Sequence, residues 1–367
     1  MPASILERLY RSDLPSFTKF AFHELSPEQN VDIGWHVDVM ADALQGCLTR
    51  DTRRLILNLP PRSLKSHCAS LCLPVFALGG DPSRKIIVVA GSLALARDLQ
   101  RRTVALMQNR RCRALFPHLR PTVTTGEIAL PQGGSILYAV VGQSLIGRGA
   151  DIIVVDDPLA PHQAQDKPRR SAVNAWYDAE LVSRMNDKAT GIMIIVMQRL
   201  HLDDLTGHLR KRDKWSKIVL PAVALRDETW PLHRRRTVSR SKGEPLQPRR
   251  EGNNRLIEIL LEVDAVNFSA QYLQQPMADT NLYRTGLYYD PRPPDWQPGM
   301  ECGGAFLRVP KVLDILYDVF GAGEQPPREA GEPPYSMEEW EEMTMIQQRR
   351  LLAEVQADQR QYDLQNC

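Results

Sequence analysis

Short apolar runs and amphipathic segments alternate along the chain as far as Leu220. The apolar runs, rich in Ile, Val and Leu, predict strands at 53–59, 85–90, 135–140, 151–157 and 191–197. Segments with apolar residues at helical spacing predict helices at 30–48, 66–78, 93–109, 169–187 and 203–212. Because both faces of these strands are apolar, the alternation indicates an α/β fold whose mainly parallel sheet is covered by helices on both sides.

The same pattern divides the chain into four parts. A helical lead-in is expected over 1–49 and the sheet domain over 50–225. Residues 226–250 hold eight basic and three acidic residues with several prolines, which indicates a basic linker or loop. With a short helix at 254–275 they make up a basic lid or linker over 226–276. The tail, 277–367, is irregular and rich in Pro and Gly, apart from a capped helix predicted at 336–360.

Charge is distributed unevenly, although 46 basic and 44 acidic residues give a net charge of only +2. Residues 311–367 hold 5 basic and 12 acidic residues, so the rest of the chain is basic. A basic body suits a polyanion partner, and a solvated surface explains a modest excess equally well. The chain start lacks the layout of a signal peptide, and the longest apolar stretch, 86–96, is far shorter than the roughly 20 residues of a membrane span.

The first candidate site is the segment PPRSLKS (60–66), between the first strand and the next helix. A phosphate-binding loop needs backbone N–H groups at a helix N-terminus, a Lys that reaches the phosphate oxygens and a hydroxyl that holds Mg²⁺. Lys65 and Ser66 provide the last two. The usual pattern places Gly where this chain has Leu59 and Leu64, and an ordinary solvated helix start would also explain Lys65 and Ser66.

The second candidate site is the pair Asp156 and Asp157, which ends the fourth predicted strand. In nucleotide hydrolases of this architecture the first carboxylate holds the Mg²⁺ ion, and the next one, more often Glu, polarises the attacking water. An ordinary turn at the end of a strand would also explain the pair. Together with the loop at 60–66, the two carboxylates favour ATP hydrolysis.

Several longer motifs carry a resemblance to a known family. They are LILNLPPRSLKS (55–66), GGSILYAVVGQSLIGRGADIIVVDDPL (133–159), KPRRSAVNAWYDAELVSRMNDKATGIMIIVMQRLHLDDLTGHL (167–209), LPAVA (220–224), GEPLQPRR (243–250) and NFSAQYLQQP (267–276). In these motifs the chain resembles the large terminase subunit of tailed bacteriophages, the ATPase that drives genome DNA into the procapsid. The resemblance extends over about 30–276, and Trp35-His36 opens the helix ahead of the first motif.

This resemblance implies a RecA-like P-loop ATPase with a helical N-terminal lead-in and an irregular, partly helical C-terminal tail. ATP and Mg²⁺ are the implied cofactors. Lys65, Arg62 and Asp157 are the expected catalytic residues, and Ser66 and Asp156 are the expected metal ligands. The implied nucleotide-binding residues are Pro61, Arg62, Ser63, Leu64, Lys65, Ser66 and Gln198.

The resemblance also suggests roles around the last strand. Gln198 stands where the family has its coupling motif, which senses the γ-phosphate, although it could simply cap the strand. Arg148 lies in a Gly-flanked loop and could touch a phosphate or a neighbouring subunit. Four residues of the motif are expected to be structural, with Asp203 as a helix cap: Arg199, His201, Asp203 and Asp204.

Implied partners are double-stranded DNA, the portal protein and the small terminase subunit, in a homo-oligomeric ring without a membrane, in the cytoplasm of the bacterial host. The basic segment is expected to contact DNA phosphates, unless it is a solvated linker. Its expected contacts are Arg234, Arg235, Arg236, Arg240, Arg249 and Arg250.

The family's nuclease domain is not evident, because residues 277–367 show no buried strand ending in Asp. We therefore expect an ATPase without nuclease activity. One alternative is a degenerate prophage remnant that binds DNA or motor partners without ATP turnover. A helicase-like ATPase is a third possibility, against which the lack of a second RecA-like lobe argues.

Overall fold

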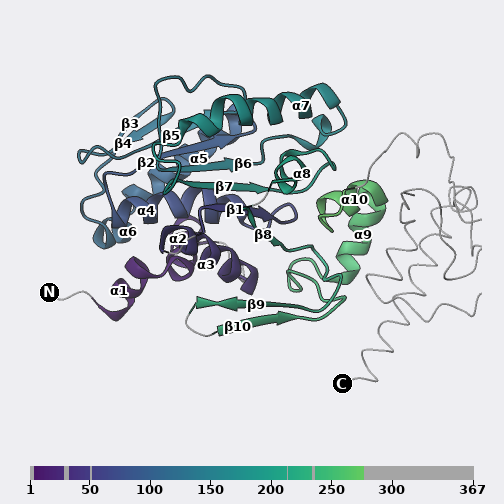
Figure 1. Ribbon diagram of the computed structural model, residues 1–367. Helices are drawn as coiled ribbons and strands as arrows, with labels where there is room; N and C mark the ends of the chain where they lie inside the picture. The colour runs from purple at the N-terminus through teal and green to yellow at the C-terminus, as the bar shows by residue number, and fades with distance from the viewer. Residues whose placement is uncertain (1–3, 29–32, 50–51, 213, 234–235, 277–367) are drawn as a thin grey trace, which may run out of the picture.

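A computed structural model describes residues 4–28, 33–49, 52–212, 214–233 and 236–276 (Figure 1). Its main sheet has the strand order β3-β4-β5-β2-β6-β7-β1-β8. The strands are β1 (Arg54–Asn58), β2 (Lys85–Ala90), β3 (Thr122–Thr124), β4 (Glu127–Ala129), β5 (Ser135–Val140), β6 (Ile152–Asp156), β7 (Ile192–Met197) and β8 (Ser216–Val219). From β5 to β8 in this order every neighbouring pair is parallel, whereas the pairs β3–β4 and β4–β5 are antiparallel. The predicted α/β fold with a mainly parallel sheet is confirmed.

Helices cover both faces of the sheet. The helices of this part are α1 (Ile5–Ser12), α2 (Leu14–Leu25), α3 (Trp35–Thr49), α4 (Leu73–Gly80), α5 (Leu93–Gln108), α6 (Arg110–Leu115), α7 (Lys167–Trp176) and α8 (Leu205–Arg210). In Figure 1, α7 and α8 lie on one side of the sheet and α2 and α3 on the other. Alternate strand residues feed the two cores: Ile194 of β7 joins the α2–α5 side, whereas Ile195 joins the α7–α8 side. This alternation is what the period of two in a strand requires.

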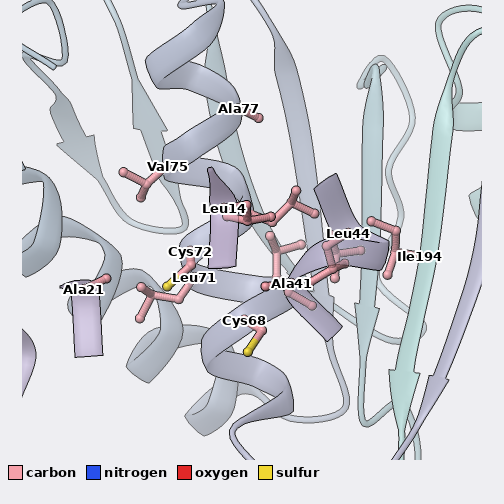
Figure 2. Close-up of a cluster of buried hydrophobic side chains, with 14 of the residues drawn as sticks. Leu14, Ala21, Ala41, Leu44, Cys68, Leu71, Cys72, Val75, Ala77 and Ile194 are labelled. Carbon is pink, nitrogen blue, oxygen red and sulfur yellow. The ribbon is translucent and has the colours of Figure 1, made fainter. Parts of the chain in front are cut away.

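The larger core lies between the sheet and the N-terminal helices, and Figure 2 shows part of it. Leu44 of α3, Leu71 and Ile194 contribute fully buried side chains. The helix that follows β1 is π-helical over His67–Cys72 before it continues as α4. Pro74 lacks the N–H that a regular α-helix would use at this point, and the wider turn ends just before it.

Three predicted helices differ in detail. The segment 169–187 is α-helical only in α7, which begins at Lys167, and then continues as a π-helix (Tyr177–Leu181) and a short 3₁₀ turn. The segment 254–275 is split into α9 (Asn253–Val263) and α10 (Ala265–Gln271) by Asp264, whose φ is +66°. Helix α8 is capped by Asp204 and not by Asp203, because the Asp204 carboxylate accepts the N–H of Gly207 at 2.8 Å.

The prediction of a linker or loop over 226–250 is wrong for its first part. An antiparallel hairpin forms there from β9 (Glu228–Leu232) and β10 (Arg236–Arg240). The hairpin packs on α3, where Trp230 stacks on Trp35 with ring centroids 5.2 Å apart. A separate small core joins Ala222 and Val223 to α9 and α10. Residues 226–276 are called the lid below.

The tail predictions, including the missing nuclease domain and the helix at 336–360, lie outside the described residues. Within the described part of the chain, no helix is long and apolar enough to cross a membrane.

Candidate functional site

The loop between β1 and the following helix has an unusual backbone. Arg62 and Leu64 have φ of +60° and +62°, the left-handed region that favours glycine. Leu64 is where the usual phosphate-loop pattern has Gly, so the loop takes the glycine-type conformation without the glycine. The Ser63 hydroxyl donates to the Pro60 carbonyl at 2.8 Å and braces the turn from inside. Helical structure begins at Lys65, so the first N–H groups of the helix face the loop.

The acidic pair at the end of β6 meets this loop. Strands β1, β7 and β6 are adjacent and parallel, so their carboxyl ends share one edge of the sheet. The Lys65 ammonium lies 3.2 Å from a carboxylate oxygen of Asp157. Asp156 accepts the hydroxyl of Ser66 at 3.0 Å and that of Ser70 at 2.6 Å. Four of the predicted residues thus meet in two pairs, Lys65 with Asp157 and Ser66 with Asp156, although about 90 residues separate the partners.

Asp156 is fully buried, and its carboxyl group titrates abnormally. Burial, and after it the negative charge of Asp157, raise the pKa of Asp156 to about 7. The hydrogen bond from Ser70, the charge of Lys65 and the hydrogen bond from Ser66 oppose this shift. A cation bound beside Asp156 would favour the ionised form of this buried carboxyl group and so lower its pKa.

Gln198 lies directly after β7, beside the acidic pair. Its backbone N–H donates to Asp157 at 3.3 Å. Its side-chain oxygen is buried and, among the described residues, finds no hydrogen-bond partner. A buried amide oxygen without a partner costs free energy, so this oxygen can accept a hydrogen bond from a donor outside the described residues.

A glycine that the sequence did not single out shapes this edge. Gly91, after β2, lies so close to Asp157 that a Cβ at this position would stand 2.1 Å from the Asp157 carbonyl oxygen. Its N–H donates to the Asp156 carbonyl at 3.2 Å. Asp157 itself has φ of +41°. Gly91 therefore permits the turn that aims the Asp157 carboxylate at the phosphate loop.

His36 of α3 is a second buried group near the loop. Burial and the charges of Arg240 and Arg250 lower the pKa of His36 to about 4. The Ser63 backbone lies close enough to oppose this shift in part, although it falls short of hydrogen-bond geometry, and neither ring nitrogen has a partner among the described residues. The ring is consequently neutral near pH 7.

The other predicted residues around the site range from exposed loop positions to buried structural ones. Arg62 is exposed, and Pro61 is half-buried in the same loop. Arg148 forms a two-pronged ion pair with Glu127 of β4, with both N–O distances at 3.0 Å. Arg199 is a buried structural residue, since its guanidinium pairs with Asp204 at 2.9 Å.

The DNA-contact set requires a correction at Arg240. This side chain is only 2% exposed; it pairs with Glu228 at 2.7 Å and donates to the Pro221 carbonyl. It also lies over the rings of Trp35 and Trp230. Arg240 therefore cannot reach a DNA phosphate, and the prediction for it is wrong. Arg236, Arg249 and Arg250 are exposed, whereas Arg234 and Arg235 lie outside the described residues.

Two residues of the site escaped sequence reasoning. Ser70 follows Ser66 by four positions, the helical spacing that lets two hydroxyls reach one carboxylate, and this signal was present in the sequence. Gly91 gave no such signal, because only the three-dimensional approach of β2 to β6 makes a side chain impossible there.

No protein-family model matches this chain, and no curated protein sequence does either. Solved structures do match. The structure is similar to bacteriophage large terminases, and to their ATPase domain in particular. The ATPase domain of the Thermus phage P74-26 large terminase is 12% identical with a TM-score of 0.45, over 69% of this chain and 96% of that one.

Two further large terminases match over shorter stretches. The HK97 bacteriophage large terminase is 16% identical with a TM-score of 0.36, over 53% of this chain and 40% of that one. The large terminase of a thermophilic bacteriophage, in complex with ADP, is 9% identical with a TM-score of 0.30, over 48% of this chain and 44% of that one. The chain thus spans less than half of these two proteins, and its activity is argued below from its own site.

Proposed function

We propose that this chain binds and hydrolyses ATP, and that it does so as a motor subunit for packaging viral double-stranded DNA. The observation that carries the ATPase part is the meeting of Lys65 and Ser66 with Asp156 and Asp157 at the carboxyl edge of the sheet. A lysine and a hydroxyl at a helix start, facing two carboxylates from a neighbouring strand, are what phosphoryl transfer in this architecture needs.

The residues present fit a nucleotide with its metal ion. Ser66 and Asp156 offer two oxygen ligands of the kind that Mg²⁺ prefers. Bound there, Mg²⁺ would neutralise charge on the phosphate oxygens. Among the described residues no cluster of three or more His, Cys, Asp or Glu side chains forms a metal site by itself, so the remaining ligands of the ion would be phosphate oxygens and water. Lys65 would attract the phosphates, and the unpartnered oxygen of Gln198 suits a water or a hydrogen-bond donor beside them.

The Lys65–Asp157 ion pair couples phosphate binding by Lys65 to the position of the Asp157 carboxylate. Binding of a phosphate group by Lys65 would release Asp157, which could then orient a water for in-line attack. Because Asp is shorter than the usual Glu by one methylene, the carboxylate stands farther from that water, and slow hydrolysis is expected. Arg62, exposed on the loop, could stabilise charge on the phosphates.

The direct test is steady-state ATPase activity of Lys65→Ala and Asp157→Asn, with exposed Lys188→Ala as control. Lys65→Ala is expected to lower turnover at least about a hundredfold, because it removes the charge that faces the phosphates. Asp157→Asn should keep nucleotide binding and lose turnover by about a hundredfold or more, as for loss of a general base. Normal turnover in Lys65→Ala would refute the ATPase proposal.

The packaging part of the proposal implies that several copies of this chain assemble into a ring. The ring would bind double-stranded DNA, the portal protein and the small terminase subunit. Turnover should therefore rise when double-stranded DNA is added. The competing function is a degenerate protein that binds DNA without turnover, and the short carboxylate at Asp157 is the observation that favours it. DNA binding by a protein with no turnover under any condition would decide for that alternative.

A further inference from the structure

Arg250, which the sequence placed among the DNA contacts, lies against the phosphate loop. Its guanidinium donates to the backbone carbonyl of Arg62 at 2.5 Å, across 188 residues of sequence. Its charge also acts on His36, whose ring neighbours the backbone of Ser63 in the same loop. The lid therefore reaches the loop through this side chain.

The lid backbone holds Arg250 in place. The N–H groups of Arg250 and Glu251 both donate to the Gln247 carbonyl, at 3.0 and 2.7 Å, which closes a tight turn. Just before this turn, Leu246 is buried in the larger core of the sheet domain. Glu251 pairs with the other terminal nitrogen of the guanidinium, Nη2, at 3.3 Å. The side chain of Arg250 is 41% exposed, and its backbone is held in a fixed position by this turn and by the buried Leu246.

The contact falls where the loop most needs support. Arg62 and Leu64 hold left-handed backbone angles without glycine, which costs about 1–2 kcal/mol per residue. Surrounding contacts must stabilise such a conformation for it to persist. The hydrogen bond from the Arg250 guanidinium to the Arg62 carbonyl is a contact of that kind, because it ties the strained loop to the lid.

We propose that Arg250 is a positioning residue of the nucleotide site, which holds the phosphate loop in its phosphate-binding conformation from the lid. This inference rests on the proposed ATPase function. The ligand class is a nucleoside triphosphate, and the consequence is that lid and loop respond together when phosphate binds.

The test compares Arg250→Ala and Arg250→Lys in the full chain. The matched control is Arg255→Ala, another lid arginine, which pairs with Glu258 and Glu262 of its own helix. Four quantities are measured: the Kd of a fluorescent ATP analogue, KM against kcat, hydrogen exchange of the backbone amides of 62–66, and the Kd for duplex DNA.

Arg250→Ala is expected to raise the nucleotide Kd and KM about tenfold, as for loss of one charge-assisted hydrogen bond, and to speed exchange in the loop. Lys can still donate to the carbonyl, so Arg250→Lys should recover part of the affinity. Arg255→Ala should change neither. If Arg250→Ala does not fold, Arg250→Lys gives the same comparison at smaller amplitude.

The outcomes separate this inference from the function beneath it. Unchanged nucleotide Kd and loop exchange in Arg250→Ala, while Lys65→Ala still abolishes turnover, would overturn the role of Arg250 alone. Weaker DNA binding at unchanged nucleotide Kd would return Arg250 to the DNA contacts and also overturn it. Normal turnover in Lys65→Ala would instead remove the ATPase function itself.

Discussion

At the scale of single residues, the site is built from backbone that ordinary side chains rarely adopt. Arg62, Leu64 and Asp157 all have positive φ, and all three lie at the meeting of loop and carboxylates. Strain of this kind gathers at sites where geometry matters more than stability. Gly91 contributes from the other side by leaving room for the Asp157 carbonyl.

A matched pair of variants measures the strain at Arg62. Arg62→Gly and Arg62→Ala both remove the exposed side chain, but only glycine adopts φ of +60° without steric cost. We expect Arg62→Gly to be more stable than Arg62→Ala by about 1 kcal/mol in urea unfolding. Equal stability of the two variants, or a more stable Ala variant, would show that the loop relaxes at this position.

Two buried histidines predict acid sensitivity. The pKa of His36 and that of His67 are both lowered to about 4, against 6.5 for a free histidine. Burial is the largest cause for both, and the charge of Arg240 adds to it for His36. Protons therefore bind the unfolded chain first, and the stability present above pH 6.5 is lost as pH falls from 6.5 towards 4.

Each histidine should cost about 1.4 kcal/mol of unfolding free energy between about pH 7.5 and 5.5. Urea unfolding of the wild type and of His36→Gln at both pH values checks this, since the variant should lose less by that amount. The same loss in the variant and the wild type would mean that His36 takes up its proton while folded.

At the scale of elements, the sequence predicted five of the parallel strands but missed the parallel edge strand β8 and the antiparallel strands β3, β4, β9 and β10. The predicted ranges of β2 and β5 coincide with the observed ones. A short run of four or more apolar residues is typical of a strand that is buried on both faces of a parallel sheet. The β9–β10 hairpin was missed because Pro231 and the arginine run hide its alternation, and because Trp35 of a distant helix supplies its packing. Much of the candidate site could be located from the sequence, since Asp156, Asp157 and Gln198 lie at the ends of apolar runs and Lys65 and Ser66 begin a helix. Ser70, Gly91 and the position of Arg250 depend instead on packing between elements.

The turn from β7 into α8 depends on one buried ion pair. Asp204 caps α8 and pairs with Arg199, and both side chains are at most 3% exposed. Asp204→Ala should destabilise the protein by about 3–5 kcal/mol, because it leaves a guanidinium buried without its partner. Asp203→Ala is the control, since its side chain is 64% exposed and it should cost less than about 0.5 kcal/mol. Chemical unfolding that ranks the two variants equally would contradict this assignment.

At the scale of the whole molecule, the lid is tied to the sheet domain around the candidate site. Trp230 stacks on Trp35, Arg250 holds the phosphate loop, and the Gln274 side chain accepts the N–H of Arg199 at 2.9 Å, directly after Gln198. Both segments that would face a nucleotide, the loop and the end of β7, therefore touch the lid. A change in either can alter how the lid presents its basic surface.

That basic surface leads to the last prediction. With Arg240 buried and Arg250 at the loop, the predicted DNA contacts that stay exposed among the described residues are Arg236 and Arg249, and Lys242 is an exposed basic residue of the same segment. A packaging motor must hold all sequences alike, so these residues should contact phosphates and release counterions. Replacing all three with Ala should weaken binding to any duplex. It should also lower the slope of log K against log salt concentration by about 0.9 for each lost contact.

The control for this change in net charge is a triple Ala variant of exposed arginines elsewhere, Arg101, Arg113 and Arg120. If both triple variants weaken DNA binding equally, the effect is one of overall charge. If the slope does not change in the lid variant, Arg236, Lys242 and Arg249 form a solvated surface. Only a larger loss of slope in the lid variant, with ATP turnover in the absence of DNA unchanged, supports DNA contact by the lid.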